Sequence, residues 1–405
     1  MILQNKKILI DGYNLELTQG TGIKTYGLTL IDVLQNMGAQ VGVLVQKYRR
    51  GQERHIEVRL LKNLLGMDIL AREINDDLIA KKKKKNLNNL DKTDYLIGLG
   101  DVFRSANILF KLLNKTTTIK THNNLKFDIW HTTYQIPINI KNVKRITTIH
   151  DIIPMVYPGT SLDKVKFFRN SIKMALSNSQ LIFTVSEHTK RDILSNFDIK
   201  HEKIFVTYQP VAIKPFNKRD PLFHQYLKNN GLSDGKYFLF VGNIEPKKNL
   251  GRLLDAYAKV DHHYPLVVVG KKAWLWENEI NNRPISNVFF LDHVSFNKLS
   301  ILYSGAFCFI FPSLYEGFGL PPLEAFTCGC PVIASNNSSL PEVCGDAALY
   351  VDPYDDMDIK AKIETVLGDS ELRKKMIKRG FKRAQNFSLD NYKSKIKEGY
   401  EKLID

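Results

Sequence analysis

Cysteine is scarce in this sequence, with four copies in 405 residues. All four lie in the last third of the chain beside small and apolar neighbours, at Cys308, Cys328, Cys330 and Cys344. Their spacing does not match a zinc ribbon, and a disulfide framework would be unusual in a chain of this size. We therefore expect reduced, buried thiols in a cytoplasmic protein.

Long hydrophobic runs are also missing. No stretch approaches the roughly 18 apolar residues that a transmembrane helix needs. The chain opens with a short apolar run that ends at Asp11, which is typical of a first strand and not of a signal peptide. Any membrane contact is therefore expected to be peripheral, on the inner face of the cytoplasmic membrane.

Acidic residues are fewer than basic ones, 42 against 58, which gives a formal net charge of +16. This excess favours an anionic partner: a nucleotide, a phospholipid surface or a nucleic acid. No recognition module for nucleic acid is present, so we expect none, and a basic nucleic-acid-binding protein is an alternative that only the charge supports. The five lysines at 81–85 are expected in a solvated loop, and whether they bind membrane stays open.

Short runs rich in Ile, Val, Leu and Phe alternate with amphipathic stretches in both halves of the chain. This is the pattern of parallel strands covered by helices on both faces, and the length predicts two domains. We expect strands at 7–11, 40–45, 145–150, 181–186, 237–242, 266–270, 288–291, 308–312, 331–335 and 347–351, with helices that include 249–260, 296–304 and 322–328. The predicted fold is two doubly wound α/β domains at 1–210 and 237–386, a linker at 211–236, and a final helix in 387–405.

A glycine-rich turn follows the predicted strand 308–312 and leads into a helix. Gly317 and Gly319 let the backbone come close to a ligand, and Pro321 or Pro322 suits the first helical turn. Free amides at a helix start bind anions. We therefore expect a phosphate at this turn.

Two carboxylates flank the same turn. Glu316 lies in the loop and Glu324 lies eight residues later, in the first turns of the helix, so both would accept hydrogen bonds from sugar hydroxyls. The alternative for Glu324 is that it only complements the positive end of the helix dipole.

A second anion signal lies after the predicted strand 237–242. Lys247 and Lys248 stand just before the predicted helix 249–260. This is the positive end of the helix dipole, where a cation is unfavourable. An anion between them and the helix amides would explain this position, whereas solvated surface lysines are the alternative. Together with the glycine turn, the two lysines would hold a pyrophosphate from two sides.

The first half offers two weaker candidates. Gly22 belongs to a loop that lacks the third glycine and the acidic residue of a dinucleotide fingerprint, but that could close on a phosphate or sugar; a turn without a ligand is equally open. His150 ends the predicted strand 145–150, where its side chain would be a polar contact or a proton relay in the cleft, or a structural histidine.

Together these motifs resemble the retaining glycosyltransferases of family 4, over nearly the whole chain. The strongest match is the Glu-x7-Glu motif from Glu316 to Glu324, followed by Gly-Cys-Pro-Val-Ile-Ala-Ser and Pro-Glu-Val-Cys-Gly-Asp-Ala-Ala. Further matches are Thr-Gly-Ile, His-Asp-Ile-Ile-Pro, Val-Ser-Glu-His-Thr-Lys-Arg-Asp and Gly-Asn-Ile-Glu-Pro-Lys-Lys-Asn. The resemblance implies the GT-B fold, in which two Rossmann-like domains face each other across a cleft.

The resemblance also implies residue roles in binding a nucleotide-sugar donor. Glu324 would bind the ribose hydroxyls, Glu316 the transferred sugar, and His150 the sugar near the reacting carbon, while the backbone of Val294 would contact the base. The diphosphate would be held by Lys248, by Gly22 from the first domain and by the amides of Gly317, Phe318, Gly319 and Leu320. Because lysines and helix amides can stabilise a departing diphosphate without Mg²⁺, we expect no metal and no cofactor.

One departure from the family pattern concerns the phosphate loop. Many members carry Arg after the first glycine or just before the Lys, where this sequence has Asn243 and Lys247. A point charge then replaces the bidentate grip of a guanidinium, and whether Lys247 fully substitutes stays open. The resemblance further implies retention of configuration by same-face attack, with the donor phosphate taking the acceptor proton.

The acceptor is expected on the first domain, where motifs are fewest. The stretch 46–120 combines many lysines and arginines with an apolar face at 108–113, which suits docking on anionic lipid. In the fold that the chain resembles, the final helix packs back on the first domain, and Phe387, Tyr392 and Ile396 would anchor it.

We expect transfer of a hexose from a nucleotide-sugar to a glycan or lipid-linked saccharide acceptor, as in building O-antigen or capsule. GDP-mannose is the first candidate donor and a UDP-sugar the next. A nucleotide-sugar epimerase of related fold is the enzymatic alternative, and the spacing from Glu316 to Glu324 favours the transferase.

Overall fold

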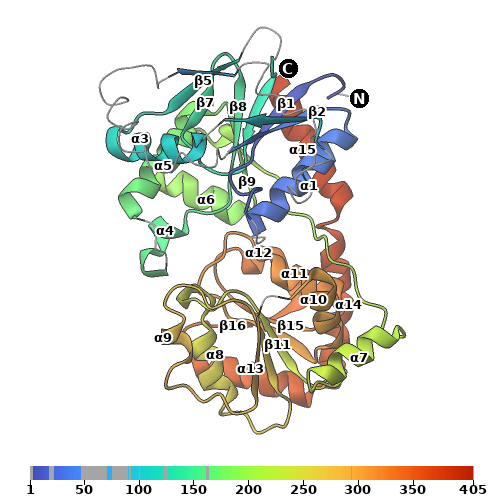
Figure 1. Cartoon of the computed structure of the whole chain (residues 1–405). Helices are drawn as coiled ribbons and strands as arrows, with labels where there is room; N and C mark the ends of the chain where they lie inside the picture. The colour runs from blue at the N-terminus through green and yellow to red at the C-terminus, as the bar shows by residue number, and fades with distance from the viewer. Residues whose placement is uncertain are drawn as a thin grey trace.

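The computed structural model describes residues 3–17, 22–46, 71–74, 90, 93–99, 101–121, 126–160, 164–292 and 294–404. These residues form two α/β domains, drawn one above the other in Figure 1. The lysines at 81–85 and the basic residues between 47 and 59 lie outside the described residues.

A seven-stranded parallel sheet with the order β10-β9-β8-β6-β1-β2-β4 is the centre of the first domain. Its strands are β1 (Lys7–Asp11), β2 (Gln40–Val45), β4 (Tyr95–Gly98), β6 (Ile129–Thr132), β8 (Lys144–Ile149), β9 (Leu181–Thr184) and β10 (Ile204–Val206). A smaller sheet joins β3 (Ala71–Ile74), β5 (Thr117–Thr121) and β7 (Ile138–Ile140). The helices are α1 (Gly22–Asn36), α3 (Val102–Leu113), α4 (Ile153–Val156), α5 (Val165–Asn178) and α6 (Glu187–Asn196). The strand order reverses between β1 and β6, the topological switch point of a doubly wound sheet.

The second domain contains a six-stranded parallel sheet with the order β13-β12-β11-β14-β15-β16. Its strands are β11 (Phe238–Val241), β12 (Leu266–Val269), β13 (Val288–Leu291), β14 (Cys308–Phe311), β15 (Val332–Ser335) and β16 (Ala348–Val351). Its helices are α7 (Pro221–Asn229), α8 (Leu250–Tyr257), α9 (Glu277–Ile280), α10 (Phe296–Gly305), α11 (Leu320–Thr327), α12 (Leu340–Cys344), α13 (Asp356–Gly368) and α14 (Ser370–Gln385). Here the switch point lies between β11 and β14, so the loops after these two strands are the expected ligand-binding segments.

Every strand that the sequence predicts is present, although several end one or two residues earlier than expected. The pattern did not predict β3, β4, β5, β6, β7 and β10. These strands are short, and β6 contains a buried polar residue, His131, which bonds to Tyr400 and Thr148 instead of solvent. The four cysteines are unpaired and buried, as predicted.

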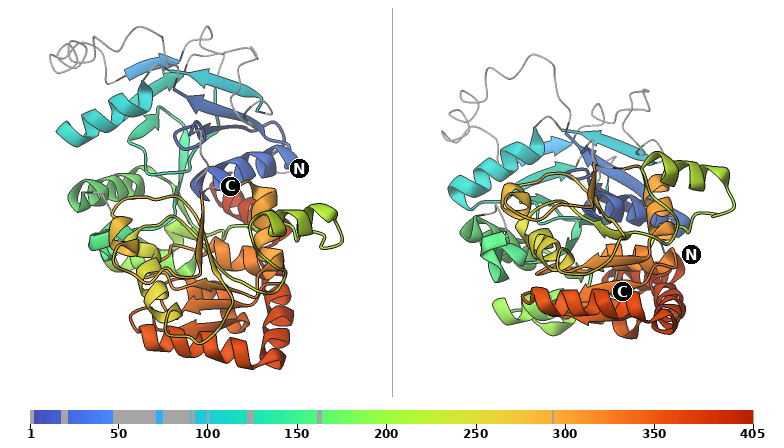
Figure 2. Two further views of the ribbon diagram at one scale, coloured as in Figure 1. Left: turned by 60° about the horizontal axis from the view of Figure 1, so that its bottom comes forward. Right: turned by 90° about the horizontal axis from the view of Figure 1, so that it is seen from below.

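The final helix, α15 (Leu389–Ile404), follows the second domain in sequence but packs on the first. Figure 1 and the left view of Figure 2 show the red C-terminal helices passing along one side of the molecule toward the first domain. Tyr392 and Ile396 lie in the core that contains β1 and β2. Phe387 was expected to act with them, but it lies in the second-domain core beside Phe318, because it precedes the helix and has not yet crossed to the first domain.

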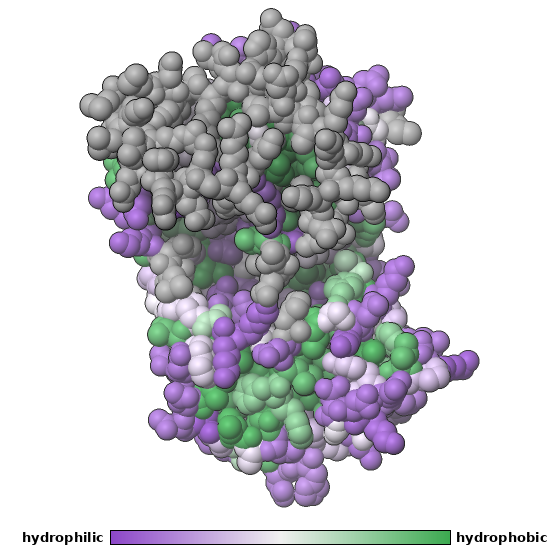
Figure 3. Space-filling model, in the orientation of Figure 1, coloured by the Kyte–Doolittle hydropathy of each residue, from purple (hydrophilic) through white to green (hydrophobic). Residues whose placement is uncertain are grey.

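Within the described residues, no helix combines the length and the apolar character needed to cross a membrane. Exposed apolar side chains occur on the second domain, where Figure 3 shows an apolar area on the face toward the viewer. On the edge strand β13, Phe289 and Phe290 are 42% and 38% exposed.

Candidate active site

The loops after β11 and β14 meet at the switch point of the second sheet. The two strands are parallel neighbours, with Phe238 paired to Cys308, so the loops that follow them begin side by side. The amide of Leu314 in the second loop donates to the carbonyl of Lys247 in the first at 2.8 Å. The structure therefore brings together the lysine pair and the glycine turn that the sequence predicts to share one ligand.

Lys248 and Glu316 form a largely buried ion pair between these two loops, with side chains 14% and 11% exposed. The Lys248 Nζ lies 2.5 Å from the Glu316 Oε1 and 5.1 Å from the centre of the Phe311 ring. Burial by itself raises the pKa of Glu316, but the charges of Lys248 and Lys247 outweigh it and hold that pKa below its ordinary value. The Glu316 side chain is therefore an ionised carboxylate at neutral pH.

Lys247 is surrounded by carboxylates. Its Nζ lies 3.7 Å from the Glu245 Oε1. Burial lowers its pKa, whereas the charges of Glu316, Asp151 and Glu245 more than compensate and raise it above the ordinary value. Neither lysine is a solvated surface residue: both are partly buried, Lys247 pairs with Glu245 and Lys248 pairs with Glu316. The charge of Asp151, from the first domain, also acts on Lys247.

The glycine turn packs directly against the first domain at Gly317, whose backbone contacts that of His150. A Cβ added at Gly317 would lie 2.4 Å from the carbonyl oxygen of His150, so only glycine fits there. The Gly317 carbonyl accepts hydrogen bonds from Ser186 Oγ at 2.6 Å and Thr189 Oγ1 at 3.1 Å. The close approach that we expected toward a ligand is thus, at this position, an approach to the other domain.

The start of α11 faces the same loop. Gly319 has a φ of 111°, which favours glycine, and it precedes the helix without a side-chain cap bond. Pro321 and Pro322 have no N–H, so among the first three residues of α11 only the Leu320 amide can donate to an anion. Leu320 begins the helix, and the ring of Phe318 is buried against Tyr208 and Phe387, so Phe318 can offer a ligand only its backbone.

Glu324 lies one helical turn into α11 and is also buried. Its Oε2 accepts a hydrogen bond from the Tyr303 hydroxyl at 3.1 Å. Burial raises the pKa of Glu324 from 4.5 to about 7. An acid with this pKa is half ionised at neutral pH, which contrasts with the fully ionised Glu316 eight residues earlier.

His150 lies at the end of β8 with both ring nitrogens engaged. Its Nε2 donates to the Thr133 carbonyl at 3.0 Å, and the Gln209 amide donates to its Nδ1 at 3.2 Å. The centres of the His150 and Tyr26 rings lie 4.9 Å apart, and the two ring planes are perpendicular, at 89°. Burial lowers the pKa of His150 to about 4, so the imidazole is neutral. This geometry favours a positioning contact over the proton relay that the sequence left open.

The remaining predicted donor contacts are more dispersed. Gly22 is the first residue of α1 and is exposed, and Asn243 is exposed in the loop after β11. Val294 follows β13 and packs partly against the second-domain core. No hydrogen bond or ion pair within the described part of the chain joins these three residues to Lys248 or Glu316.

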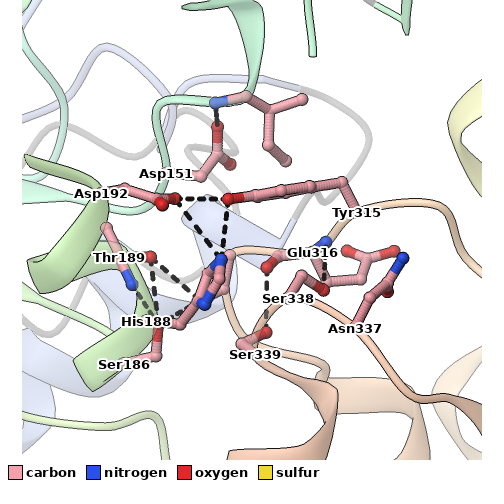
Figure 4. A network of polar contacts seen from close by, with 12 residues as sticks. Asp151, Ser186, His188, Thr189, Asp192, Tyr315, Glu316, Asn337, Ser338 and Ser339 are labelled. Atoms are coloured by element: carbon pink, nitrogen blue, oxygen red, sulfur yellow. Dashed lines mark hydrogen bonds and ion pairs between the residues drawn. The ribbon is translucent and has the colours of Figure 1, made fainter. Parts of the chain in front are cut away.

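The sequence did not predict a network of polar contacts between the domains, of which Figure 4 shows the part around His188 and Tyr315. Ser186 caps α6 by accepting from the Thr189 amide at 3.0 Å, and Glu342 lies in the first turn of α12. In the structure, the carboxylate of Glu342 accepts from the amides of Glu187 and His188 at 2.7 and 2.8 Å, and so caps α6 from the other domain. No local pattern reveals such a contact, because 155 residues separate the partners.

Tyr315 extends this network next to Glu316. Its hydroxyl donates to Asp192 Oδ2 at 2.7 Å and accepts from His188 Nε2 at 2.7 Å. Both partners belong to α6 of the first domain. The residue before the ionised carboxylate is therefore fixed across the domain boundary.

The two Rossmann-like domains face each other through the carboxyl ends of their sheets. Ammonium groups, a carboxylate and a helix start lie at the switch point of the second sheet. This arrangement is that of a glycosyltransferase of the GT-B fold. Residues 20–214 match the family described as Glycosyltransferase Family 4, and residues 224–383 match Glycosyl transferases group 1. The chain belongs to glycosyltransferase family 4.

Individual relatives agree with this assignment. The chain is 34% identical over 273 residues to the O-antigen chain mannosyltransferase B of Escherichia coli, covering 64% of this chain and 71% of the relative. It is also 34% identical over 263 residues to the O-antigen chain mannosyltransferase RfbU of Salmonella typhimurium, covering 64% and 67%. Among solved structures, Anabaena HepE in complex with UDP-glucose matches with a TM-score of 0.69 and 14% identity, covering 98% of this chain and 99% of HepE.

Proposed function

We propose that this enzyme transfers a hexose, with retention of configuration, from a nucleotide-sugar to a glycan or lipid-linked saccharide acceptor of a surface polysaccharide. GDP-mannose is the first candidate donor, because both relatives named above are O-antigen mannosyltransferases. A UDP-sugar is the next candidate, because the HepE structure contains UDP-glucose.

The observation that carries this proposal is the 2.5 Å pair of Lys248 and Glu316 beside the start of α11. A bound diphosphate would take Lys248 and Lys247 as partners and accept hydrogen bonds from the amides of residues 317–320. Glu316 would then be released to accept hydrogen bonds from hydroxyls of the transferred sugar. Glu324 would bind the ribose, and the backbone of Val294 the base.

The reaction would need little from protein acids or bases. The bond between the anomeric carbon and the phosphate oxygen breaks, and the diphosphate leaves with the electron pair. The lysine ammonium groups stabilise its charge, so we propose no metal cofactor. The acceptor hydroxyl attacks the face that the diphosphate leaves and passes its proton to a phosphate oxygen. His150, neutral and bonded through both nitrogens, would position the sugar and not move protons.

Product analysis tests the reaction. The full chain is incubated with GDP-mannose or UDP-glucose and octyl glycoside acceptors, with EDTA present, and the anomeric configuration of the new linkage is measured by NMR. We expect transfer with retention, and a loss of at least 100-fold in the Lys248→Gln variant but not in the exposed control Lys259→Gln. An inverted linkage would overturn retention, and an epimerised donor formed without acceptor would support the epimerase.

We also propose peripheral contact with anionic lipid on the inner face of the cytoplasmic membrane, because the net charge is +16. Flotation with anionic vesicles at low salt tests this. The protein should float with the vesicles, and intact protein that stays at the bottom would overturn the contact.

A further inference from the structure

Tyr26 contacts His150 from the helix that begins at Gly22. It lies four residues after Gly22 in α1 and is only 2% exposed. The centres of the Tyr26 and His150 rings lie 4.9 Å apart, and their planes are perpendicular. The imidazole is bonded through its two nitrogens to Thr133 and Gln209, and the Tyr26 ring blocks its displacement toward α1. The position of His150 therefore depends on where Tyr26 is held.

The Tyr26 hydroxyl is the end of a buried series of hydrogen bonds formed by Tyr26, Thr148, His131 and Tyr400. It lies 2.9 Å from the Oγ1 of Thr148, a residue of β8 that stands two positions before His150. The same Oγ1 lies 2.8 Å from His131 Nε2, and His131 Nδ1 lies 2.6 Å from the Tyr400 hydroxyl. Thr148, His131 and Tyr400 are 0% exposed, so solvent does not reach these bonds.

Each member of the buried series orients the next. Burial lowers the pKa of His131 to about 3, so its ring is neutral and carries one N–H. If this N–H points to Tyr400, the other nitrogen accepts from the Thr148 hydroxyl, which then accepts from Tyr26. If it points to Thr148, every bond of the series reverses. In both cases, removing the Tyr400 hydroxyl leaves a buried nitrogen without a partner, and the series loses its fixed end.

Tyr400 belongs to α15, the helix that follows the second domain in sequence. Tyr392, earlier in the same helix, places its ring centre 6.2 Å from that of Tyr26. Near the end of α14, Arg383 Nε donates to the carbonyl of Val343 in the second domain at 2.8 Å. The C-terminal segment is therefore fixed to the second domain through Arg383 and contacts Tyr26 through α15.

On the basis of the glycosyltransferase function proposed above, we propose that Tyr26 is a positioning residue for His150. Tyr400 of α15 holds Tyr26 in place through the buried series. Tyr26 does not touch the substrate; it keeps the imidazole against the transferred sugar while the diphosphate leaves. The final helix thus contributes to the geometry of the active site from behind it.

Steady-state kinetics of the full chain, with the donor that product analysis identifies, test this role. Tyr26→Leu, which removes the ring, should lower kcat about tenfold and leave the KM of the donor within about twofold, because only the orientation at the reacting carbon is lost. Tyr26→Phe and Tyr400→Phe keep their rings and should each lower kcat about threefold. The double Phe variant should be no slower than either single variant, because both act through one series. An unchanged kcat in Tyr400→Phe would overturn the proposal.

Tyr257→Phe is the matched control. The Tyr257 hydroxyl is also buried and donates to the Tyr264 carbonyl at 2.5 Å, but it belongs to α8 of the second domain. Losing this bond should lower the stability as the other exchanges do and leave kcat unchanged. A threefold loss of kcat in this control as well would show a general effect of lost stability and would overturn the positioning role.

The NMR signal of the His150 Cε1–H, recorded with ¹³C-labelled histidine, provides a readout that needs no activity. The signal is assigned by its absence from His150→Gln. Because the Tyr26 ring lies so close, its ring current acts on this signal, which should shift in Tyr400→Phe and stay in Tyr257→Phe. If the signal shifts but the original chain transfers no sugar, the proposed function fails and the contact stands. If the original chain transfers sugar and the signal does not shift, the positioning role alone fails.

Discussion

Exchanging Glu324 for Gln should stabilise the folded protein at alkaline pH while it damages the donor site. Folding raises the pKa of this carboxyl to about 7 by burial, from 4.5. Between pH 4.5 and about pH 7, the Glu324 carboxyl is therefore ionised in the unfolded chain and still protonated in the folded chain. The contribution of Glu324 to stability is therefore fully present below pH 4.5 and is lost as the pH rises through about 7.

The magnitude follows from the two pKa values. Keeping the ionised carboxylate buried costs roughly 3 kcal/mol at high pH, and roughly 1 kcal/mol of that is already present at pH 5.5. Gln keeps the shape and can still accept from the Tyr303 hydroxyl, but it carries no charge. The free energy of unfolding of Glu324→Gln relative to the original chain should therefore rise by roughly 2 kcal/mol between pH 5.5 and pH 8.5.

Urea unfolding at the two pH values measures this difference. Asp11 and Glu16 also have raised pKa values, of about 6 and 7, but they are present in both proteins and cancel in the comparison. Glu364→Gln, an exchange on the exposed surface of α13, is the matched control and should show no such change. A stability difference for Glu324→Gln that is the same at both pH values would refute the reasoning.

Two further variants test how the domains meet. In Gly317→Ala the new Cβ would lie 2.4 Å from the His150 carbonyl oxygen, so the turn must shift and transfer should fall by roughly 100-fold. Gly368→Ala, whose Cβ would meet nothing within 4 Å, is the control. Full activity of Gly317→Ala would show that this contact does not form in the working enzyme. Glu342→Ala removes the cap of α6, which contributes roughly 1 to 2 kcal/mol and joins the two domains. Small-angle X-ray scattering should then show a larger radius of gyration. An unchanged radius of gyration would contradict a role of Glu342 in holding the domains together.

The sequence predicts most of what depends on local chemistry. Apolar runs predict the buried strands, such as the one at 266–270, and the glycine-rich turn is predicted at Gly319, which has a φ of 111°. These features are encoded within a few residues, where backbone conformation and hydrogen bonding limit the choice of side chain.

What the sequence did not predict depends on long-range contacts. The carboxylate of Glu342 serves amides 155 residues away, and Gly317 is required by the His150 carbonyl of the other domain. The Lys248 and Glu316 pair is similar: each residue was expected to meet a ligand, but only the fold shows that they neutralise each other. Short strands such as β6 were missed because the buried partners of His131 come from β8 and α15.

The most direct test of the account is a comparison of GDP and GMP binding by the original chain and by Lys248→Gln, measured by calorimetry. If the lysine pair and the turn at 317–320 hold a diphosphate, the original chain should bind GDP far more tightly than GMP, and the variant should lose most of that difference. Equal binding of GDP and GMP by the original chain, or a difference that persists in the variant, would contradict the central claim.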